Sequence, residues 1–152
     1  MIRPVRRSPE YQKPDWFTKH VFNNLVALLT TLGISAWGSR LLRVRGRKSG
    51  RWYETPVNLL THEGRRYLVA PRGETQWVRN VRASSSGELR VGRRRETIRV
   101  RELSDSEKLP IVRAYLRKWA WEVGQFFHGV GPDASDPALA EEARRHPVFA
   151  IE

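Results

Sequence analysis

The sequence predicts one mainly β domain with helices attached, an α+β chain organised around an antiparallel barrel. Short apolar stretches separated by glycine-containing turns recur between residues 41 and 103, which is typical of strands joined in hairpins. Helical periodicity marks the regions on either side and one short internal segment. With 152 residues, the chain is long enough for a single domain with a substantial core.

The N-terminal region predicts an arm followed by a helix. Residues 1–14 are rich in proline and cations, so we expect a flexible basic arm outside a domain of residues 15–152. Apolar residues recur at helical spacing from Asp15 to about Leu32, and Gly33 is a suitable stop. Residues 21–39 carry no charge, so this helix either buries one face in the domain or lies on a bilayer surface.

The central region predicts a β-rich block with one short helix. Strands are expected at residues 41–45, 52–60 and 65–70. A helix is expected at 75–83, because Trp77, Val78 and Val81 would share one face and Thr75 suits the N-cap. Residues 84–87 (SSSG) are interpreted as a loop. A further hairpin is expected from strands 88–91 and 97–103, with the basic tip at residues 92–95.

The C-terminal third predicts two helices and a closing strand. Ser104 and Glu107 match a capping box that opens a helix running to about residue 127. Asp136-Pro137 opens a shorter helix to about residue 145, and residues 148–151 form the last strand. Residues 126–128 (FFH) lie among glycines, and they are interpreted either as a lid over an aromatic substrate or as ordinary core.

Composition limits the chemistry. The formal charge of +12 favours an anionic partner such as a phosphorylated cofactor, an acidic membrane or nucleic acid. The absence of cysteine excludes disulfides and thiolate sites. The four histidines are far apart in sequence, so no metal site is predicted. Glu141 and Glu142 are interpreted as surface charges, and no carboxylate pair suggests acid–base catalysis.

Residues 45–51 (RGRKSGR) place four cations on a turn between two predicted strands. Backbone amides of a glycine-rich turn can converge on an anion, and Arg, Lys and Ser side chains add hydrogen bonds to phosphate. The alternative is a hairpin turn with solvated charges.

A second basic junction, Pro71-Arg72-Gly73, precedes the short helix, whose N-terminus suits an anion. We therefore expect the two junctions to converge on one anionic ligand.

The stretches RGRKSGRWYETPVNLL, RRYLVAPRG and WVRNVRA together resemble the deazaflavin-dependent nitroreductase and quinone-reductase family. The resemblance covers residues 20–103 well and the C-terminal helices loosely. It implies a split β-barrel flanked by an N-terminal helix and C-terminal helices. It also implies coenzyme F420, rather than FMN, as the hydride carrier, and a quinone-like or nitro-aromatic acceptor. No side chain of the chain itself is predicted to be catalytic.

The resemblance also assigns residues to the cofactor. The phosphate would be held at the cationic turn, the deazaflavin ring would lie along the next strand, and a second loop with its helix would complete the site. The residues assigned to the phosphate are Arg47, Lys48, Ser49 and Gly50, and those assigned to the ring are Pro56, Val57 and Asn58. The second loop consists of Ala70, Pro71, Arg72 and Gly73, and its helix contributes Trp77 and Asn80.

Two departures from the family pattern leave an alternative open. Tyr53 stands where many members have arginine, and the loop between Gly73 and Trp77 is short and contains Glu74. The alternative is a cofactor-free branch that binds fatty acid or a membrane surface. The location expected is cytoplasmic, with peripheral contact at the inner face of the membrane in that alternative. A monomer or homodimer is expected, and no nucleic-acid motif is present.

Overall fold

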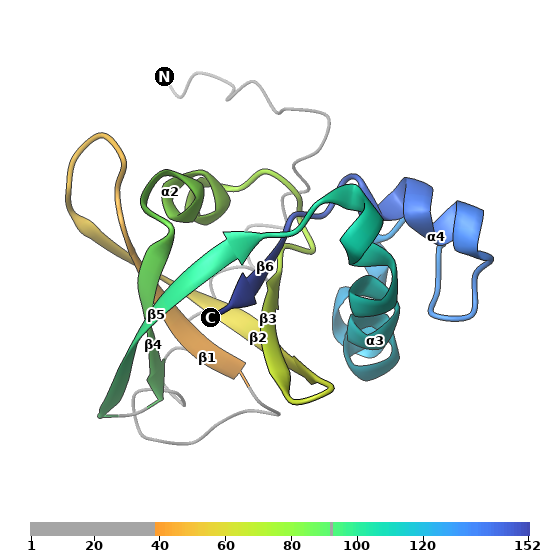
Figure 1. The fold of residues 1–152 in the computed structure, drawn as a ribbon, viewed down its shortest axis with the longest axis horizontal. Helices are drawn as coiled ribbons and strands as arrows, with labels where there is room; N and C mark the ends of the chain where they lie inside the picture. Colours follow the sequence, from red (N-terminus) through yellow and green to blue (C-terminus); the bar gives the residue numbers. More distant parts are fainter. Residues whose placement is uncertain (1–38, 92) are drawn as a thin grey trace, which may run out of the picture.

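The computed structural model describes residues 39–91 and 93–152, and its six strands close into an antiparallel barrel (Figure 1). The strand order around the barrel is β1-β2-β3-β6-β5-β4, and β4 pairs with β1. The strands are β1 (Ser39–Arg45), β2 (Trp52–His62), β3 (Arg65–Val69), β4 (Ser86–Val91), β5 (Arg94–Glu102) and β6 (Val148–Ile151). The predicted barrel is therefore confirmed, whereas the predicted arm and N-terminal helix lie outside the described residues.

Two long strands divide the barrel into halves. β2 pairs with β1 from Trp52 to Asn58 and with β3 from Leu59 to His62. β5 likewise pairs with β4 through residues 94–99 and with β6 through residues 100–102. Because each long strand leaves one neighbour and joins another, the barrel is split, as the resemblance implied.

The barrel interior forms one of two cores. Consecutive side chains of a strand point to opposite faces, so Leu68 and Ala70 face the interior while Tyr67 and Val69 face outward. The helix α2 (Gln76–Ser84) adds Val78 and Val81, which are fully buried against the interior core. The predicted core face of this helix is confirmed.

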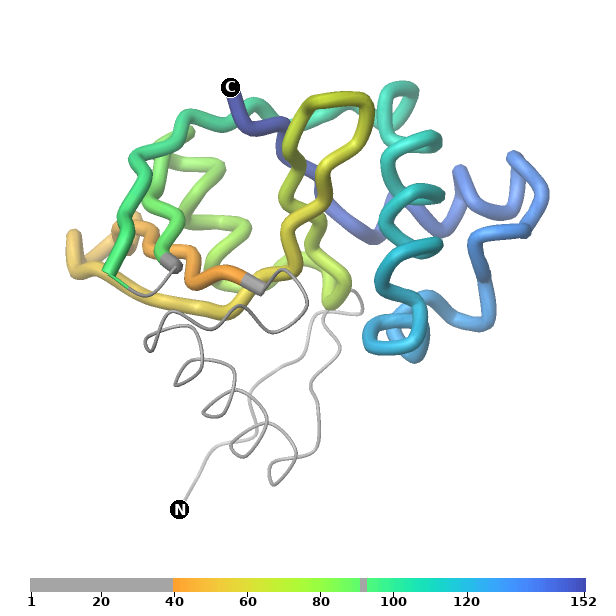
Figure 2. Tube along the Cα trace, turned by 90° about the horizontal axis from the view of Figure 1, so that it is seen from below, coloured from red at the N-terminus to blue at the C-terminus, as the bar shows by residue number. Residues whose placement is uncertain are grey.

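The second core lies between the outer face of β3 and β6 and the C-terminal helices. Both views place α3 (Asp105–Val123) and α4 (Asp136–Ala143) together on one side of the barrel (Figures 1 and 2). Tyr115 and Trp119, one helical turn apart, are buried in this core. A 3₁₀ turn, η1 (Gly124–Phe126), follows α3, and it brings Phe126 and Phe127 into the same core rather than into a lid.

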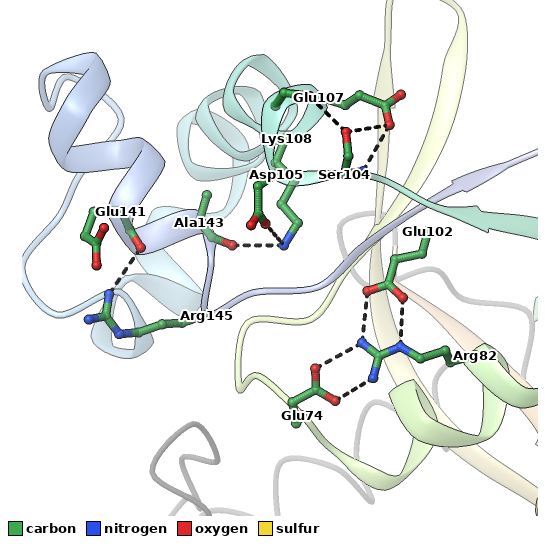
Figure 3. Close-up of polar contacts among 11 residues, drawn as sticks. Glu74, Arg82, Glu102, Ser104, Asp105, Glu107, Lys108, Glu141, Ala143 and Arg145 are labelled. Carbon is green, nitrogen blue, oxygen red and sulfur yellow. Dashed lines mark hydrogen bonds and ion pairs between the residues drawn. The ribbon is translucent and has the colours of Figure 1, made fainter.

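Polar contacts fix α3 at its N-terminus. The Ser104 N–H donates to the Glu107 carboxylate at 3.0 Å, which confirms the predicted capping box (Figure 3). The buried Lys108 ammonium donates to the Ala143 carbonyl of α4 at 3.2 Å and pairs with Asp105. This contact satisfies a buried cation and joins the two helices.

Two boundaries differ from the prediction. Ser84 ends α2 and β4 starts at Ser86, so residues 84–87 are not a loop. The β4–β5 pairing extends to Val91 and Arg94, so Arg94 and Arg95 belong to the strand rather than to the hairpin tip. In both places the regular structure extends further into the polar segment, because backbone pairing continues wherever a strand partner is available.

Candidate functional site

The cationic turn between β1 and β2 is a closed hairpin loop. The Gly46 N–H donates to the Arg51 carbonyl at 2.7 Å, and the Gly50 N–H donates to the Gly46 carbonyl at 2.9 Å. Gly50 has a φ of 72°, which favours glycine. At Gly46 a Cβ would lie 2.7 Å from both Ser49 Oγ and the Tyr53 ring. Both glycines are therefore required by the shape of the turn.

Arg47 attaches this turn to α2. Its backbone N–H donates to Asn80 Oδ1 at 3.1 Å, and its guanidinium donates to the same oxygen at 2.8 Å. The guanidinium also donates to Gln76 Oε1 at 3.0 Å. Asn80 is buried, so its side chain belongs to the support of the turn. The fold thus brings Arg47 and Asn80, which are far apart in sequence and were predicted to share one site, into direct contact.

The tip of the turn presents unpaired donors. The exposed Lys48 ammonium has no hydrogen-bond or ion-pair partner among the described residues. Within the same part of the chain, the backbone N–H groups of Lys48 and Ser49 donate to no acceptor. The Ser49 hydroxyl accepts from the Arg51 N–H and lies 3.3 Å from the Tyr53 hydroxyl. One cation, two amides and a hydroxyl on a rigid turn fit a phosphate group.

The second loop is a turn stabilised by its own backbone. The Gly73 N–H donates to the Ala70 carbonyl at 3.2 Å, and Gly73 has a φ of 83°. The Arg72 guanidinium lies 5.3 Å from the centre of the Phe126 ring, so it is directed toward the C-terminal helices. Thr75 holds the predicted N-cap position, but its buried hydroxyl does not cap the helix and has no hydrogen-bond partner among the residues that the structure describes.

Glu74 at this loop is paired with Arg82, which it shares with Glu102. The nearby cations Arg79 and Lys108 also reduce its negative potential. Arg82 bonds both oxygens of Glu74, at 2.9 and 3.0 Å, and both oxygens of Glu102, at 2.7 and 2.9 Å (Figure 3). Hydrogen bonding to Arg82 lowers the pKa of Glu74, and the two carboxylates raise the pKa of Arg82. Arg82 is therefore committed to an internal ion-pair network rather than to a ligand.

Along β2 the three predicted ring-facing residues divide between two faces. Val57 is buried in the barrel interior, so only its backbone can border a ligand. Pro56 and Asn58 lie on the opposite face and are partly exposed. The Asn58 side chain lies near Glu122, where burial raises the pKa of the carboxyl group and Asn58 partly offsets that effect.

Trp77 lies on α2, just after the second loop. Its ring is partly buried and packs against Phe149 of β6, with 6.0 Å between ring centres. Trp77 therefore joins the helix to the last strand, and its contact with a cofactor stays a prediction.

A cluster that the sequence did not predict lies behind the second loop. Glu142, expected on the surface, is only 2% exposed and is hydrogen-bonded to both His128 and His146. Burial raises the pKa of Glu142, but the two histidine contacts outweigh it and leave this pKa below its ordinary value. The available signal was the i,i+4 spacing of Glu142 and His146, although His146 lies in the turn beyond the end of α4. No three His, Asp or Glu side chains of the described residues are arranged to hold a metal ion.

Comparison with known proteins identifies the class and then the family. The split barrel with attached helices is the fold that the resemblance to deazaflavin-dependent reductases implied. The sequence profile described as F420H(2)-dependent quinone reductase matches residues 18–125, so the chain belongs to this family. The members of this family are oxidoreductases that use coenzyme F420, as the resemblance implied. Comparison with curated proteins gives no match.

Solved structures share the fold at low sequence identity. One, described as a domain-swapped dimer, is 20% identical over 91% of this chain and 98% of its own, with a TM-score of 0.53. An Agrobacterium tumefaciens protein of unknown function is 13% identical over 99% and 58%, with a TM-score of 0.54. A conserved hypothetical protein from Mycobacterium tuberculosis is 11% identical over 97% and 85%, with a TM-score of 0.51. These similarities establish the fold alone.

None of the helices within residues 39–91 and 93–152 has both the length and the apolar character that crossing a bilayer requires. The uncharged residues 21–39, on which the membrane interpretation depended, lie almost entirely outside this part of the chain.

Proposed function

We propose that the chain reduces a quinone-like or nitro-aromatic acceptor with F420H2, and that the cofactor lies between the cationic turn and the second loop. Lys48, Ser49 and the neighbouring amides bind the phosphate. Pro56, Asn58 and the Val57 backbone border the deazaflavin, and residues 70–73 form the opposite edge. In this arrangement F420H2 supplies the hydride, and the protein binds and orients both reactants.

The observation that carries the proposal is the contact of Arg47 with α2. This side chain bonds Gln76 and Asn80, so the turn is fixed to the helix that starts three residues after Gly73. A rigid support beneath Lys48 reduces the entropy lost when the tip binds an anion. The ion pair of Glu74 with Arg82, which Glu102 shares, weakens the negative potential that would oppose that anion.

Titration of the protein with F420, followed by cofactor fluorescence, tests the site. The wild type is expected to bind in the micromolar range, more weakly as salt is added, because exposed charges are screened. Lys48→Ala is expected to raise the Kd about tenfold, the loss expected for one charge-assisted hydrogen bond. Arg117→Ala removes an exposed cation from α3, away from the turn, and is the matched control.

The outcome that contradicts the proposal is a wild type that shows no micromolar F420 binding, or a control that weakens binding as much as Lys48→Ala. The first of these results would revive the cofactor-free branch. Oxidation of F420H2 with a quinone and with a nitro-aromatic compound, compared at equal concentration, then identifies the acceptor class. Sedimentation of the purified chain distinguishes the monomer from the homodimer.

A further inference from the structure

The buried Glu142 carboxylate is the centre of a three-residue polar cluster. His146 Nε2 lies 2.6 Å from Glu142 Oε2, and both groups are almost fully buried. His128 Nδ1 lies 2.9 Å from the same oxygen, and about half of the His128 side chain is exposed. A buried carboxylate is costly unless it is paired, so this cluster has to be kept together by its hydrogen bonds.

His146 also contacts the first residue of the second loop. Its Nδ1 lies 3.3 Å from the Ala70 carbonyl oxygen, and the carbonyl of the next residue, Pro147, accepts the Ala70 N–H at 2.9 Å. The dipeptide His146-Pro147 therefore contacts both backbone groups of Ala70. The imidazole is stacked on Phe127, with 3.9 Å between ring centres, so it has little freedom to turn.

The segment 126–128 adds a second connection to the loop. Phe126 lies under the Arg72 guanidinium, Phe127 stacks on His146, and His128 bonds Glu142. Three consecutive residues thus contact, in turn, the loop, the buried imidazole and the carboxylate. His128 has a φ of 52°, which is uncommon for a residue other than glycine, although histidine tolerates it better than most.

The number of protons on His146 decides which of its contacts can form. The Ala70 carbonyl and an ionised Glu142 both accept hydrogen bonds, and they face opposite ring nitrogens. A neutral imidazole carries one N–H and can donate to only one of them, and the shorter distance favours the carboxylate. A protonated imidazole donates to both, so the Ala70 contact forms fully when the ring gains its second proton.

We propose that His146 is a positioning residue for the Ala70–Gly73 loop, and that protonation of its ring, oriented by Glu142, tightens the loop through the Ala70 carbonyl. The proposal rests on the proposed function, because this loop is one edge of the proposed cofactor site.

Other charged groups face the cluster from the elements packed around it. Arg145 lies 3.5 Å from Glu142, Lys108 donates to the Ala143 carbonyl beside Asp105, and Arg72 lies on Phe126. Burial lowers the pKa of His146, so the transition is expected below the ordinary histidine value.

Two substitutions of similar size separate the nitrogens of His146. His146→Asn retains a donor near the Nδ1 position, which faces Ala70, whereas His146→Gln retains one near the Nε2 position, which faces Glu142. Both remove the stack on Phe127, so a merely structural role predicts similar effects. Under the proposal, the Asn variant keeps the tight loop at all pH values and the Gln variant never forms it.

The first measurement uses NMR and needs no cofactor. The amide signals of Arg72 and Gly73 in the wild type are expected to titrate together with the His146 ring. In His146→Asn their chemical shifts are expected to stay, at every pH, at the values that the wild type has at low pH. In His146→Gln they are expected to stay at the values that the wild type has at high pH. Glu142→Gln should lower the pH of this titration, because an amide does not stabilise an imidazolium, and Glu141→Gln, an exposed neighbour, should not change it.

His128 also contacts Glu142, so His128→Asn serves as a control for its contribution. Asparagine tolerates the left-handed backbone of this position and removes the ring. The loop signals are expected to titrate in this variant as well. If the titration disappears in His128→Asn, or if the Asn and Gln variants of His146 give the same loop signals, the proposal is wrong.

The second measurement is F420 affinity. His146→Gln is expected to bind roughly fivefold more weakly than His146→Asn, in line with one neutral hydrogen bond. Equal affinities in these two variants would show that the Ala70 contact does not position the cofactor loop. If the wild type does not bind F420 at all, the proposed function fails while the NMR result still decides the role of His146.

Discussion

At the scale of single residues, α3 contains two buried polar atoms, Tyr115 Oη and Trp119 Nε1, that have no hydrogen-bond partner within residues 39–91 and 93–152. Burial raises the pKa of Tyr115, because the ionised phenolate would lose its solvation, and the charge of Glu122 adds to this shift. The Asn58 side chain offsets it only in part, because the contact does not reach hydrogen-bond geometry. An unpaired buried hydroxyl costs about 1–3 kcal/mol of folding free energy. Tyr115 therefore contributes to the core through its ring, and its hydroxyl opposes that contribution.

Tyr115→Phe is accordingly expected to raise the free energy of unfolding by about 1 kcal/mol, because it removes the unpaired group and keeps the ring. Urea unfolding followed by tryptophan fluorescence measures the change. Tyr53→Phe, at an exposed tyrosine near the start of β2, is the control and should stay within about 0.5 kcal/mol of the wild type. A clear loss of stability in Tyr115→Phe would mean that the hydroxyl has a partner in solution.

At the scale of elements, the junction between α2 and β4 shows why residues 84–87 were interpreted wrongly. Serine and glycine clusters are typical of loops, but here each residue has a different local role. Ser85 is the C-cap of α2, with a φ of 56°, and its N–H donates to the Val81 carbonyl at 2.7 Å. Gly87 lies in a strand, where a Cβ would come within 2.9 Å of the Arg43 carbonyl. The glycine thus permits close strand contact, and the turn is made by serine.

Ser85→Gly is expected to stabilise the protein by roughly 0.5–1 kcal/mol, because glycine adopts the left-handed conformation without strain. Ala83→Gly, two residues earlier in the exposed part of the same helix, should have the opposite sign, with a loss of about 1 kcal/mol. Thermal unfolding of the two variants beside the wild type compares them directly. If both glycines destabilise the protein equally, the left-handed cap is not a source of strain.

The same scale explains what the sequence could predict about the site. Strand alternation and helical spacing depend on neighbouring residues, so the barrel strands, the capping box at Ser104 and the core face of α2 were predictable. The pairing of Arg47 with Asn80 was predictable only as membership of a common site, because the contact joins residues far apart in the chain. Glu142 was misassigned because Glu141 and Glu142 look alike in sequence, and the buried one is selected by His128, which the fold brings to it.

At the scale of the whole molecule, the large positive charge is partly balanced by ion pairs between elements. Arg82 joins α2 to the end of β5, Arg66 on β3 bonds Glu96 on β5, and Arg101 on β5 bonds Glu107 on α3. The hydrogen bond from Arg66 lowers the pKa of Glu96, and the hydrogen bonds from Arg101 and Ser104 lower the pKa of Glu107 to about 2. Each exposed pair contributes little alone, but together they make folding depend on ionised carboxylates.

Acid is therefore expected to destabilise the protein. In the unfolded chain carboxylates bind protons near pH 4.5, whereas Glu74, Glu96, Glu107 and Glu142 in the folded chain do so only at lower pH. The stability that these four carboxylates contribute above about pH 4.5 is lost as the pH falls through their pKa values in the folded protein, because the unfolded state binds more protons in this range. His146 acts in the same direction below about pH 6.5, and Glu122, whose pKa is raised, acts in the opposite direction.

The urea midpoint measured from about pH 7 to about pH 3.5 is expected to decline, with the first change below the ordinary histidine pKa and a steeper one in the carboxylate range. Protonating the carboxylates also raises a net charge that is already +12, and this repulsion adds to the loss. Glu96→Gln removes one of the ion-paired carboxylates and should flatten the steeper part, whereas Glu63→Gln, an exposed carboxylate of the β2–β3 turn, should leave it unchanged. A midpoint that stays constant across this range would mean that the ion pairs between elements do not stabilise the folded chain, and that their short distances reflect surface contacts of negligible energy.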